Sequence, residues 1–256
     1  MTGSAKKIPS FLEHHETLSS TNDRAWEIIA KEGKMADRGV VVADFQEKGR
    51  GRAGRKWFAE KSGSLLVSVI YMPPGSGEIQ LLPLATGLGA IKAIFSCAGT
   101  EARLKWPNDI VVEGKKMGGI LVETRSSGGE VTGAVIGIGL NLRGNAADFP
   151  EEIRASATTL EMSSGKACER DQVLAALFEQ LNYYLDLCFS SPGELAGELS
   201  GLWAHRPGDT MKVSFRGQTI EGVFGGVNAS GELVLATSSG ETRLIQGEIL
   251  ENGDDA

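Results

Sequence analysis

A basic, glycine-rich stretch at residues 49–57, GRGRAGRKW, carries the side chains best suited to chemistry. Glycine lets a backbone approach a ligand closely, and the arginine fork pairs bidentately with phosphate or carboxylate. Trp57 ends the stretch with a flat aromatic surface on which a purine can stack. These residue types predict a loop that folds over a nucleotide or an acyl phosphate.

Two known phosphate-binding patterns match this stretch in part, but the residues that follow it do not fit either pattern. Gly49, Gly51 and Gly54 match the G-x-G-x-x-G dinucleotide pattern, but that pattern requires a helix to follow, and none is predicted here. A Walker A loop needs Ser or Thr after its lysine, whereas Trp57 follows Lys56. A solvated basic turn or an Arg-Gly contact to nucleic acid remains open on these residues alone.

Three further clusters combine polar residues or glycines with apolar runs. KWPND at 105–109 stands between two apolar runs, and its Asn-Asp pair suits a turn. Lys116 precedes Met-Gly-Gly, where a ligand can approach the backbone, and GIGLN at 137–141 combines glycines with the amide of Asn141. Taken singly, these clusters also fit a hairpin corner, a surface lysine and an ordinary strand end.

The elements that must position these clusters can be predicted from periodicity and turn residues. Hydroxyls of SSTN at 19–22 are natural N-caps for a helix that ends at Gly33. Buried strands are predicted at 39–45, 64–72, 102–106, 109–125 (bent at 114–116) and 131–141. Further helices are predicted at about 78–97, 170–189 and 193–204, with short helical pieces in a loop at 143–169.

The order of these elements indicates an α+β fold, a mixed sheet with helices. From Pro207 onward the chain shows short alternating strands separated by Gly, Asn and Ser turns, which predict a small β-barrel or sandwich. We therefore predict two domains, a larger one at 1–205 and a small β-domain at 206–256.

Composition limits the classes of function. The 256 residues carry a formal net charge of −7 and a pI near 5.2, which argues against non-specific nucleic-acid binding by the whole protein. Three widely spaced cysteines and three histidines argue against a zinc site and fit a reducing compartment. No secretory signal and no run of 18 apolar residues is recognisable, so a cytoplasmic protein without a membrane span is expected.

Taken together and in order, the clusters resemble the biotin–protein ligases, also called biotin–[acetyl-CoA-carboxylase] ligases. The matching strings are SSTN (19–22), Q-x-x-GRGRAGRKW (46–57), KWPNDI (105–110), KKMGGILVE (115–123) and GIGLN (137–141). The resemblance extends over about residues 14–250. It implies a catalytic core like that of class II aminoacyl-tRNA synthetases, followed by a small SH3-like β-barrel.

The family reaction has two steps. Biotin is activated by ATP, with Mg²⁺, to biotinyl-5′-AMP, and the biotin then passes to a lysine of a biotin carboxyl carrier protein, a subunit of acetyl-CoA carboxylase or another biotin-dependent carboxylase. Both steps need cations and amides placed in advance around developing negative charge. A reactive anhydride must also be shielded from water, which a closing loop can do.

The resemblance also assigns roles to individual residues. The residues implied in biotin binding are Ser20, Thr21, Asn22, Gln46, Gly49, Arg50, Gly119 and Gly137. Those implied in ATP binding are Arg50, Arg52, Arg55, Trp57, Lys116 and Asn141. The implied catalytic residues are Lys116 as the main cation, Arg52, Asn108 and Asp109, and Asp109 is also the implied metal ligand.

Two departures and two alternatives accompany the resemblance. Some members begin with a DNA-binding domain of about sixty residues, but few residues precede SSTN here, so no specific DNA binding is expected. The acidic residues after GEI (247–249) replace a basic residue of some relatives. A lipoate ligase of the same superfamily and a non-catalytic nucleic-acid-binding regulator are the alternatives. Family members include sheet-edge dimers, which leaves a homodimer open.

Overall fold

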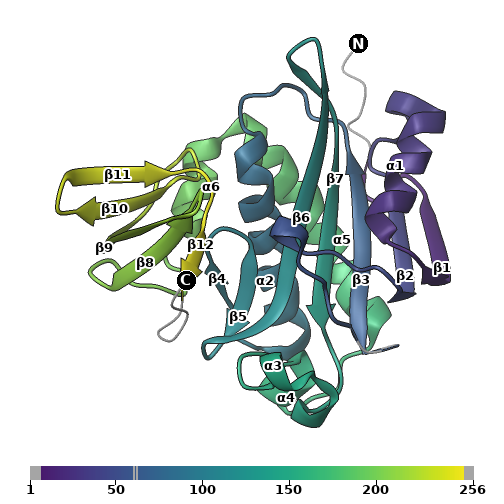
Figure 1. Ribbon diagram of the computed structural model, residues 1–256. Coiled ribbons are helices and arrows are strands. Elements are labelled where there is room, and N and C mark those ends of the chain that lie inside the picture. Colours follow the sequence, from purple (N-terminus) through teal and green to yellow (C-terminus); the bar gives the residue numbers. More distant parts are fainter. Residues whose placement is uncertain (1–6, 60, 62, 251–256) are drawn as a thin grey trace.

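The computed structural model describes residues 7–59, 61 and 63–250, so the acidic residues at 251–256 lie outside the described residues. A mixed seven-stranded sheet forms the centre of the larger part, with the order β1-β2-β3-β7-β6-β5-β4 (Figure 1). Only β1 and β2 run parallel among these pairs of described strands. Its strands are β1 (Leu12–Leu18), β2 (Val40–Gln46), β3 (Ser64–Tyr71), β4 (Arg103–Lys105), β5 (Asp109–Val112), β6 (Lys115–Ser127) and β7 (Glu130–Asn141).

Helices lie on both sides of this sheet, which confirms the predicted α+β fold. The α-helices are α1 (Thr21–Glu32), α2 (Leu82–Ala98), α3 (Glu151–Arg154), α4 (Leu160–Ser164), α5 (Arg170–Ser190) and α6 (Pro192–Leu199). Short 3₁₀ turns occur at Gly33–Ala36, Arg52–Gly54, Ile79–Leu81 and Ala146–Asp148.

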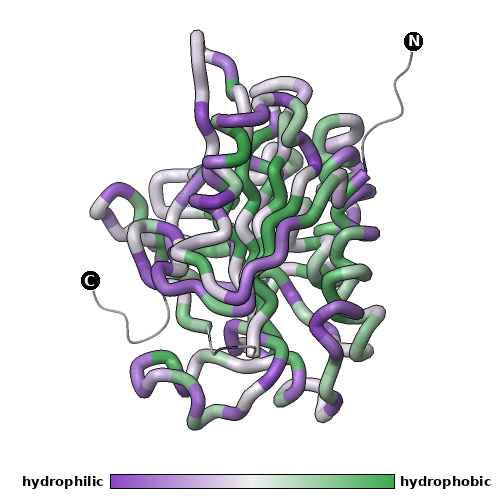
Figure 2. Tube along the Cα trace, turned by 90° about the vertical axis from the view of Figure 1, so that its right-hand side faces the viewer, coloured by the Kyte–Doolittle hydropathy of each residue, from purple (hydrophilic) through white to green (hydrophobic). Residues whose placement is uncertain are grey.

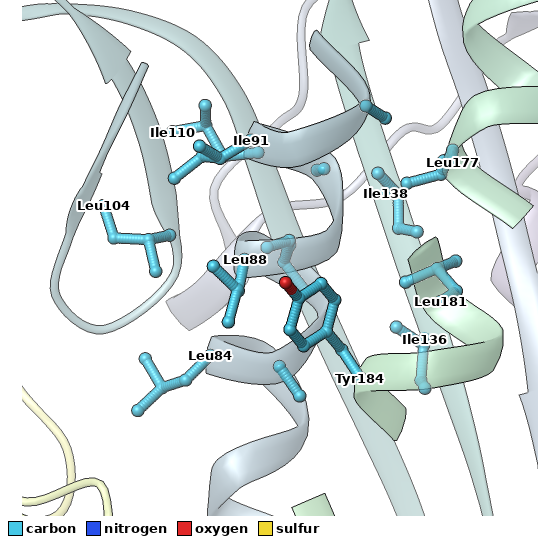
Figure 3. Close-up of a cluster of buried hydrophobic side chains, with 14 of the residues drawn as sticks. Leu84, Leu88, Ile91, Leu104, Ile110, Ile136, Ile138, Leu177, Leu181 and Tyr184 are labelled. Carbon is cyan, nitrogen blue, oxygen red and sulfur yellow. The ribbon is translucent and has the colours of Figure 1, made fainter. Parts of the chain in front are cut away.

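One face of the sheet is closed by α2 and α5. Because successive strand residues point to opposite faces, alternate residues of β3 and β7 join one core cluster with these helices. Figure 3 shows Leu84, Leu88 and Ile91 of α2 on the side of Leu104 and Ile110, with Leu177 and Leu181 of α5 on the other side of this helix. Among the described residues, Ile79–Ala98 is long and apolar enough to cross a membrane, but 72% of its apolar window is buried inside the protein. It is the core helix of this face.

The opposite face is only partly covered. The apolar side of α1 packs on the intervening residues Val41, Ile70 and Val135, one from each of three neighbouring strands. Both faces of β3 are therefore buried, which explains why its sequence is a continuous apolar run without alternation. Figure 2 shows the hydrophobic residues concentrated along the central strands.

The C-terminal residues form a five-stranded antiparallel sheet with the order β11-β10-β9-β8-β12. Its strands are β8 (Thr210–Phe215), β9 (Gln218–Val227), β10 (Leu233–Thr237), β11 (Gly240–Leu244) and β12 (Glu248–Leu250). Its buried side continues into the core of the larger part, and Trp106 Nε1 donates to Gly231 O at 3.1 Å. This small sheet therefore sits firmly beside the β4–β5 turn (Figure 1).

Four local predictions need correction. The segment 109–125 is not one bent strand, because Glu113 and Gly114 both adopt positive φ angles and reverse the chain between β5 and β6. The last helix ends at Leu199, since the following residues pair with β4 through Leu104 N and Leu202 O at 2.7 Å. Ser20 precedes α1 but makes no side-chain capping hydrogen bond. Strand β1 has no counterpart among the predicted strands, because its sequence LEHHETL lacks an apolar run.

Candidate active site

A cavity of about 340 Å³ opens on the part of the sheet that α1 leaves uncovered. Its walls come from the start of α1, the end of β2, the glycine-rich loop (49–57), β6, β7, the α3 region and β12. The predicted site residues that line it are Ser20, Thr21, Asn22, Gln46, Arg50, Arg52, Arg55, Trp57, Asn108, Asp109, Lys116, Gly119, Gly137 and Asn141. Gly49 is not among the lining residues.

Glycines of β6 and β7 create the space. A Cβ atom added to Gly137 would lie 2.5 Å from Asn22 Oδ1, and one added to Gly139 would lie 2.5 Å from a ring carbon of Trp57. A Cβ on Gly119 would meet the same indole at 3.1 Å. Side chains at these positions would therefore occupy the floor of the cavity or push its walls apart.

A chain of hydrogen bonds runs under one end of the cavity. Gln46 Oε1 accepts from the backbone N of Thr21 at 2.7 Å and lies 3.0 Å from Thr21 Oγ1. Ser68 Oγ, fully buried on β3, lies 2.7 Å from Thr21 Oγ1 and 2.6 Å from Asn22 Oδ1. Sequence reasoning missed Ser68, because a lone serine inside an apolar strand run gives no signal of its own.

This chain fixes which groups can donate to a ligand. The amide oxygens of Gln46 and Asn22 can only accept hydrogen bonds. The three oxygen–oxygen contacts of this chain therefore depend on two hydrogens, one on the Thr21 hydroxyl and one on the Ser68 hydroxyl. In this arrangement both hydrogens are used inside the protein, and Thr21 Oγ1 is left to meet a ligand as an acceptor. Gln46 Nε2 has no protein acceptor among the described residues and remains a donor.

Arg50 connects the glycine-rich loop to α1. Its guanidinium donates to both carboxylate oxygens of Asp23, at 2.8 and 2.7 Å, and to Glu123 Oε1 at 3.3 Å. The hydrogen bond from Arg50 lowers the pKa of Asp23 and, in return, raises the pKa of Arg50. The positive charge of Arg50 is thus balanced by carboxylates of the protein itself.

Arg52 and Arg55 connect the other end of the loop to the C-terminal sheet. Arg52 donates to Asn108 Oδ1 at 3.3 Å and to Gly247 O at 3.4 Å, while Arg55 pairs with Glu248 of β12. Burial lowers the pKa of Arg52 and outweighs the opposite effect of Asp109. A partly buried guanidinium that has only weak neutral partners provides a place for an anion.

Lys116, at the start of β6, lines the cavity. Its ammonium forms a 2.7 Å ion pair with Asp109 Oδ1 and lies 5.7 Å from the centre of the Trp57 ring. The Nε1 of Trp57 is buried and has no hydrogen-bond partner among the described residues. The arrangement places a cation, a carboxylate and an aromatic face beside one another.

An apolar end of the cavity was not predicted. Phe58 and Phe149 lie with ring centroids 6.2 Å apart at an interplanar angle of 54°, and Ile153 lines the same region. Asn141 is nearly buried there and donates to Thr158 O at 3.2 Å. The segment 143–169 has little periodicity, so the sequence did not indicate that it supplies cavity walls.

No group of three His, Cys, Asp or Glu side chains in the described part of the chain could hold a metal ion. A cation at this site could take some of its ligands from a bound anion. Asp109, one-quarter exposed at its side chain, is the cavity carboxylate beside Lys116 and could supply one oxygen.

Comparisons with known proteins identify a family. Residues 15–141 match the Biotin/lipoate A/B protein ligase family. The chain is 32% identical over 249 residues to the bifunctional ligase/repressor BirA of Bacillus subtilis, covering 93% of this chain and 73% of that protein. It is 29% identical to the biotin–[acetyl-CoA-carboxylase] ligase of Paracoccus denitrificans, over 92% of this chain and all of that one.

A solved structure has the same fold. The biotin protein ligase of Aquifex aeolicus in complex with biotin and ATP superimposes with a TM-score of 0.78 at 29% identity, covering 94% of this chain and 98% of that chain. On these likenesses, the chain belongs to the biotin–protein ligase family and has the activity of a biotin–[acetyl-CoA-carboxylase] ligase.

Proposed function

We propose that the cavity binds biotin at its Thr21–Gln46 end and ATP toward Trp57 and Phe149, so that both half-reactions take place beneath the glycine-rich loop. The relatives support the two ligands, since the Aquifex aeolicus structure is a complex with biotin and ATP. The assignment of individual residues rests on the contacts within this chain.

The donor and acceptor pattern at Thr21 and Gln46 carries the proposal. A cyclic urea presents N–H groups and a carbonyl side by side, and Thr21 Oγ1 as acceptor with Gln46 Nε2 as donor is complementary to that pair. A dithiolane ring offers neither group and would leave Gln46 Nε2 without an acceptor, which is costly in a buried site. The pattern therefore favours biotin over lipoate.

Lys116 is the proposed catalytic cation of the first step. A carboxylate oxygen of biotin attacks the α-phosphorus of ATP, the bond to the bridging oxygen breaks, and pyrophosphate leaves. The Lys116 ammonium stabilises the negative charge on the pentavalent phosphorus, and the Asp109 ion pair holds that ammonium in place. Arg52, partly buried and weakly partnered, neutralises the departing phosphates.

Mg²⁺ is proposed to bind this site together with the nucleotide. Asp109 would supply one carboxylate oxygen, and phosphate oxygens and water the rest, as is usual for Mg²⁺. The bound ion would neutralise phosphate charge.

The second step passes biotin to a carrier lysine. The lysine amine attacks the carbonyl carbon of biotinyl-5′-AMP, the bond to the phosphate oxygen breaks, and AMP leaves with the bonding electrons. Asn108 and Asp109, at the β4–β5 turn, are proposed to orient that amine. The carrier is proposed to be the biotin carboxyl carrier protein of a biotin-dependent carboxylase, and the reaction is proposed to occur in the cytoplasm.

The glycine-rich loop is proposed to retain the adenylate. It is joined to α1 by Arg50 and to β12 by Arg55, on opposite sides of the cavity. Loss of the Arg52 side chain should speed escape of the adenylate more than it weakens biotin binding. Equal losses of biotin affinity and of adenylate retention would contradict this role.

The decisive experiment uses the intact mass of a carrier domain. The full chain is incubated with Mg²⁺, ATP and a biotin carrier domain, with biotin in one reaction and lipoate in the other. Gain of one biotinyl group, with no gain from lipoate, is the expected result. Modification by lipoate alone would support a lipoate ligase, and DNA affinity that falls steeply with salt without any biotin-dependent ATP turnover would support a regulator.

A further inference from the structure

We propose that Glu123, to which the sequence assigned no role, is a positioning residue that joins the biotin end of the cavity to the glycine-rich loop. The inference rests on the proposed function of the cavity. It concerns a side chain that does not line the cavity but contacts residues that do.

The carboxylate of Glu123 accepts hydrogen bonds from two separate segments. Its Oε2 accepts from Asn22 Nδ2 at 3.0 Å and from Trp26 Nε1 at 3.2 Å, both on α1. Its Oε1 accepts from Arg50 Nη2 at 3.3 Å. One side chain thus holds the first turns of α1 with one oxygen and the glycine-rich loop with the other.

The place of Glu123 on β6 explains why it can reach both. Gly119 and Leu121 line the cavity, and Glu123 is the next residue on the same side of the strand. Its partner in the ladder is Val135, which packs under α1. Glu123 therefore stands where the α1-covered part of the sheet ends and the cavity begins.

Asn22 has little freedom to move in response to the loop. Its Oδ1 contacts Ser68 Oγ at 2.6 Å, and Gly137 packs against the same amide. Asp23 also holds Arg50, but it makes no contact with Asn22 through its side chain in the described structure. Glu123 is thus the shared partner of Asn22 and Arg50, and it fixes the loop relative to the biotin end.

The substitution Glu123→Gln separates the two contacts. The amide oxygen can take the place of Oε2 and keep the bonds from Asn22 and Trp26, whereas the amide nitrogen then faces Arg50 donor to donor. We expect release of preformed biotinyl-5′-AMP to become about tenfold faster, as for loss of one charge-assisted hydrogen bond. The dissociation constant of biotin alone should change by less than about threefold, because its binding groups stay in place.

Release is measured on complexes formed from biotin and α-³²P-labelled ATP, by filter retention after dilution. Arg50→Gln should also speed release, and the double variant should release no faster than Arg50→Gln alone, because both changes act through the same contact. The control is Glu130→Gln, an exposed glutamate at the start of β7 on the same hairpin, which should behave as the wild type.

Three results would overturn the inference while the wild type still forms and transfers the adenylate. The first is a Glu123→Gln variant that releases biotinyl-5′-AMP at the wild-type rate. The second is a Glu123→Gln variant that loses biotin affinity and adenylate retention to the same extent. The third is a double variant whose release rate is raised by the product of the two single effects. A wild type that forms no biotinyl-5′-AMP would instead overturn the proposed function on which the inference rests.

Discussion

The two faces of the seven-stranded sheet are buried by different means. On one face, α2 and α5 supply large apolar side chains along the length of the central strands, such as Leu88 and Leu181 (Figure 3). On the other face α1 covers only part of the sheet, and beyond Val135 the strand β7 continues with Gly137 and Gly139 under a cavity. The same strands form both faces, and the faces differ because alternate residues of each strand point to opposite sides.

This difference separates stability from function within single strands. The closed face gains free energy from apolar burial, whereas the open face gives up such burial at its glycines so that a ligand can lie against the backbone. Substitutions on the closed face should therefore change the free energy of unfolding, and substitutions on the open face should change binding and catalysis.

The largest expected effect lies on the closed face. Leu88→Ala removes a fully buried side chain of α2 from the core of this face, and we expect the free energy of unfolding to fall by about 2–5 kcal/mol. Denaturant unfolding measures this loss, and adenylate formation per folded molecule should stay close to the wild-type rate. If Leu88→Ala lowered activity without lowering stability, the closed face would not be the part of the sheet that serves stability alone.

On the open face, Lys116→Ala should leave stability nearly unchanged and lower the rate of adenylate formation about 10²–10³-fold, the usual range for losing one group that stabilises developing charge. Pyrophosphate release in single-turnover reactions measures it. The adjacent Lys115 is exposed, so Lys115→Ala is the matched control and should behave as the wild type. Equal rates for the two variants would remove Lys116 from the mechanism.

The glycine floor offers a finer test of where each ligand lies. Gly137→Ala places a methyl group 2.5 Å from Asn22 Oδ1, whereas Gly139→Ala places one 2.5 Å from the Trp57 ring. We expect the first to weaken biotin binding and the second to weaken ATP binding, each by about 1–3 kcal/mol. Calorimetric titration with either ligand measures both. If Gly137→Ala weakened ATP binding and Gly139→Ala weakened biotin binding, the two ligands would occupy the opposite ends of the cavity.

The smallest expected effect is on the pH dependence of stability. Hydrogen bonding to Arg50 lowers the pKa of Asp23 below its usual 3.8, so the ion pair stabilises the folded state above that value and is lost as pH falls through the lowered pKa. Because the Asp23 side chain is 45% exposed, the contribution should be below about 1 kcal/mol.

Thermal unfolding of wild type and Asp23→Asn at several pH values measures this contribution. The difference in melting temperature should be constant at neutral pH and shrink below about pH 4. A difference that grows on acidification would show that Asp23 does not stabilise the fold through Arg50.

Most of the central strands could be predicted because they are apolar on both faces. The exceptions depend on contacts distant in sequence. Strand β1 is an edge strand with the exposed sequence LEHHETL, and its pairing with β2 defines it. The reversal at Glu113 was missed because a glutamate rarely adopts a positive φ angle, so a bend was predicted where the chain turns back.

Most of the cavity-lining residues that lie in the motifs were predicted, whereas the residues that support them were not. The cavity brings together Lys116, Trp57 and residues 20–22 of SSTN, as expected, although they come from different elements. Ser68, Glu123 and Phe149 were not anticipated. A buried serine, a strand glutamate and a phenylalanine in an irregular segment each have ordinary structural explanations, and only their neighbours in space show that they support the site.

The sequence by itself determined the chemistry of this protein, because arginines, glycines and a lysine at fixed spacings restrict what a loop and a strand end can hold. It also determined the central strands β2, β3 and β7, since burial on both faces requires apolar or small residues along their length. Tertiary structure decided which partner each charge has. Arg50 meets Asp23 and Glu123, Arg55 meets Glu248, and Lys116 meets Asp109. Such pairings follow from distances of a few ångströms between segments far apart in the chain, which no local pattern encodes.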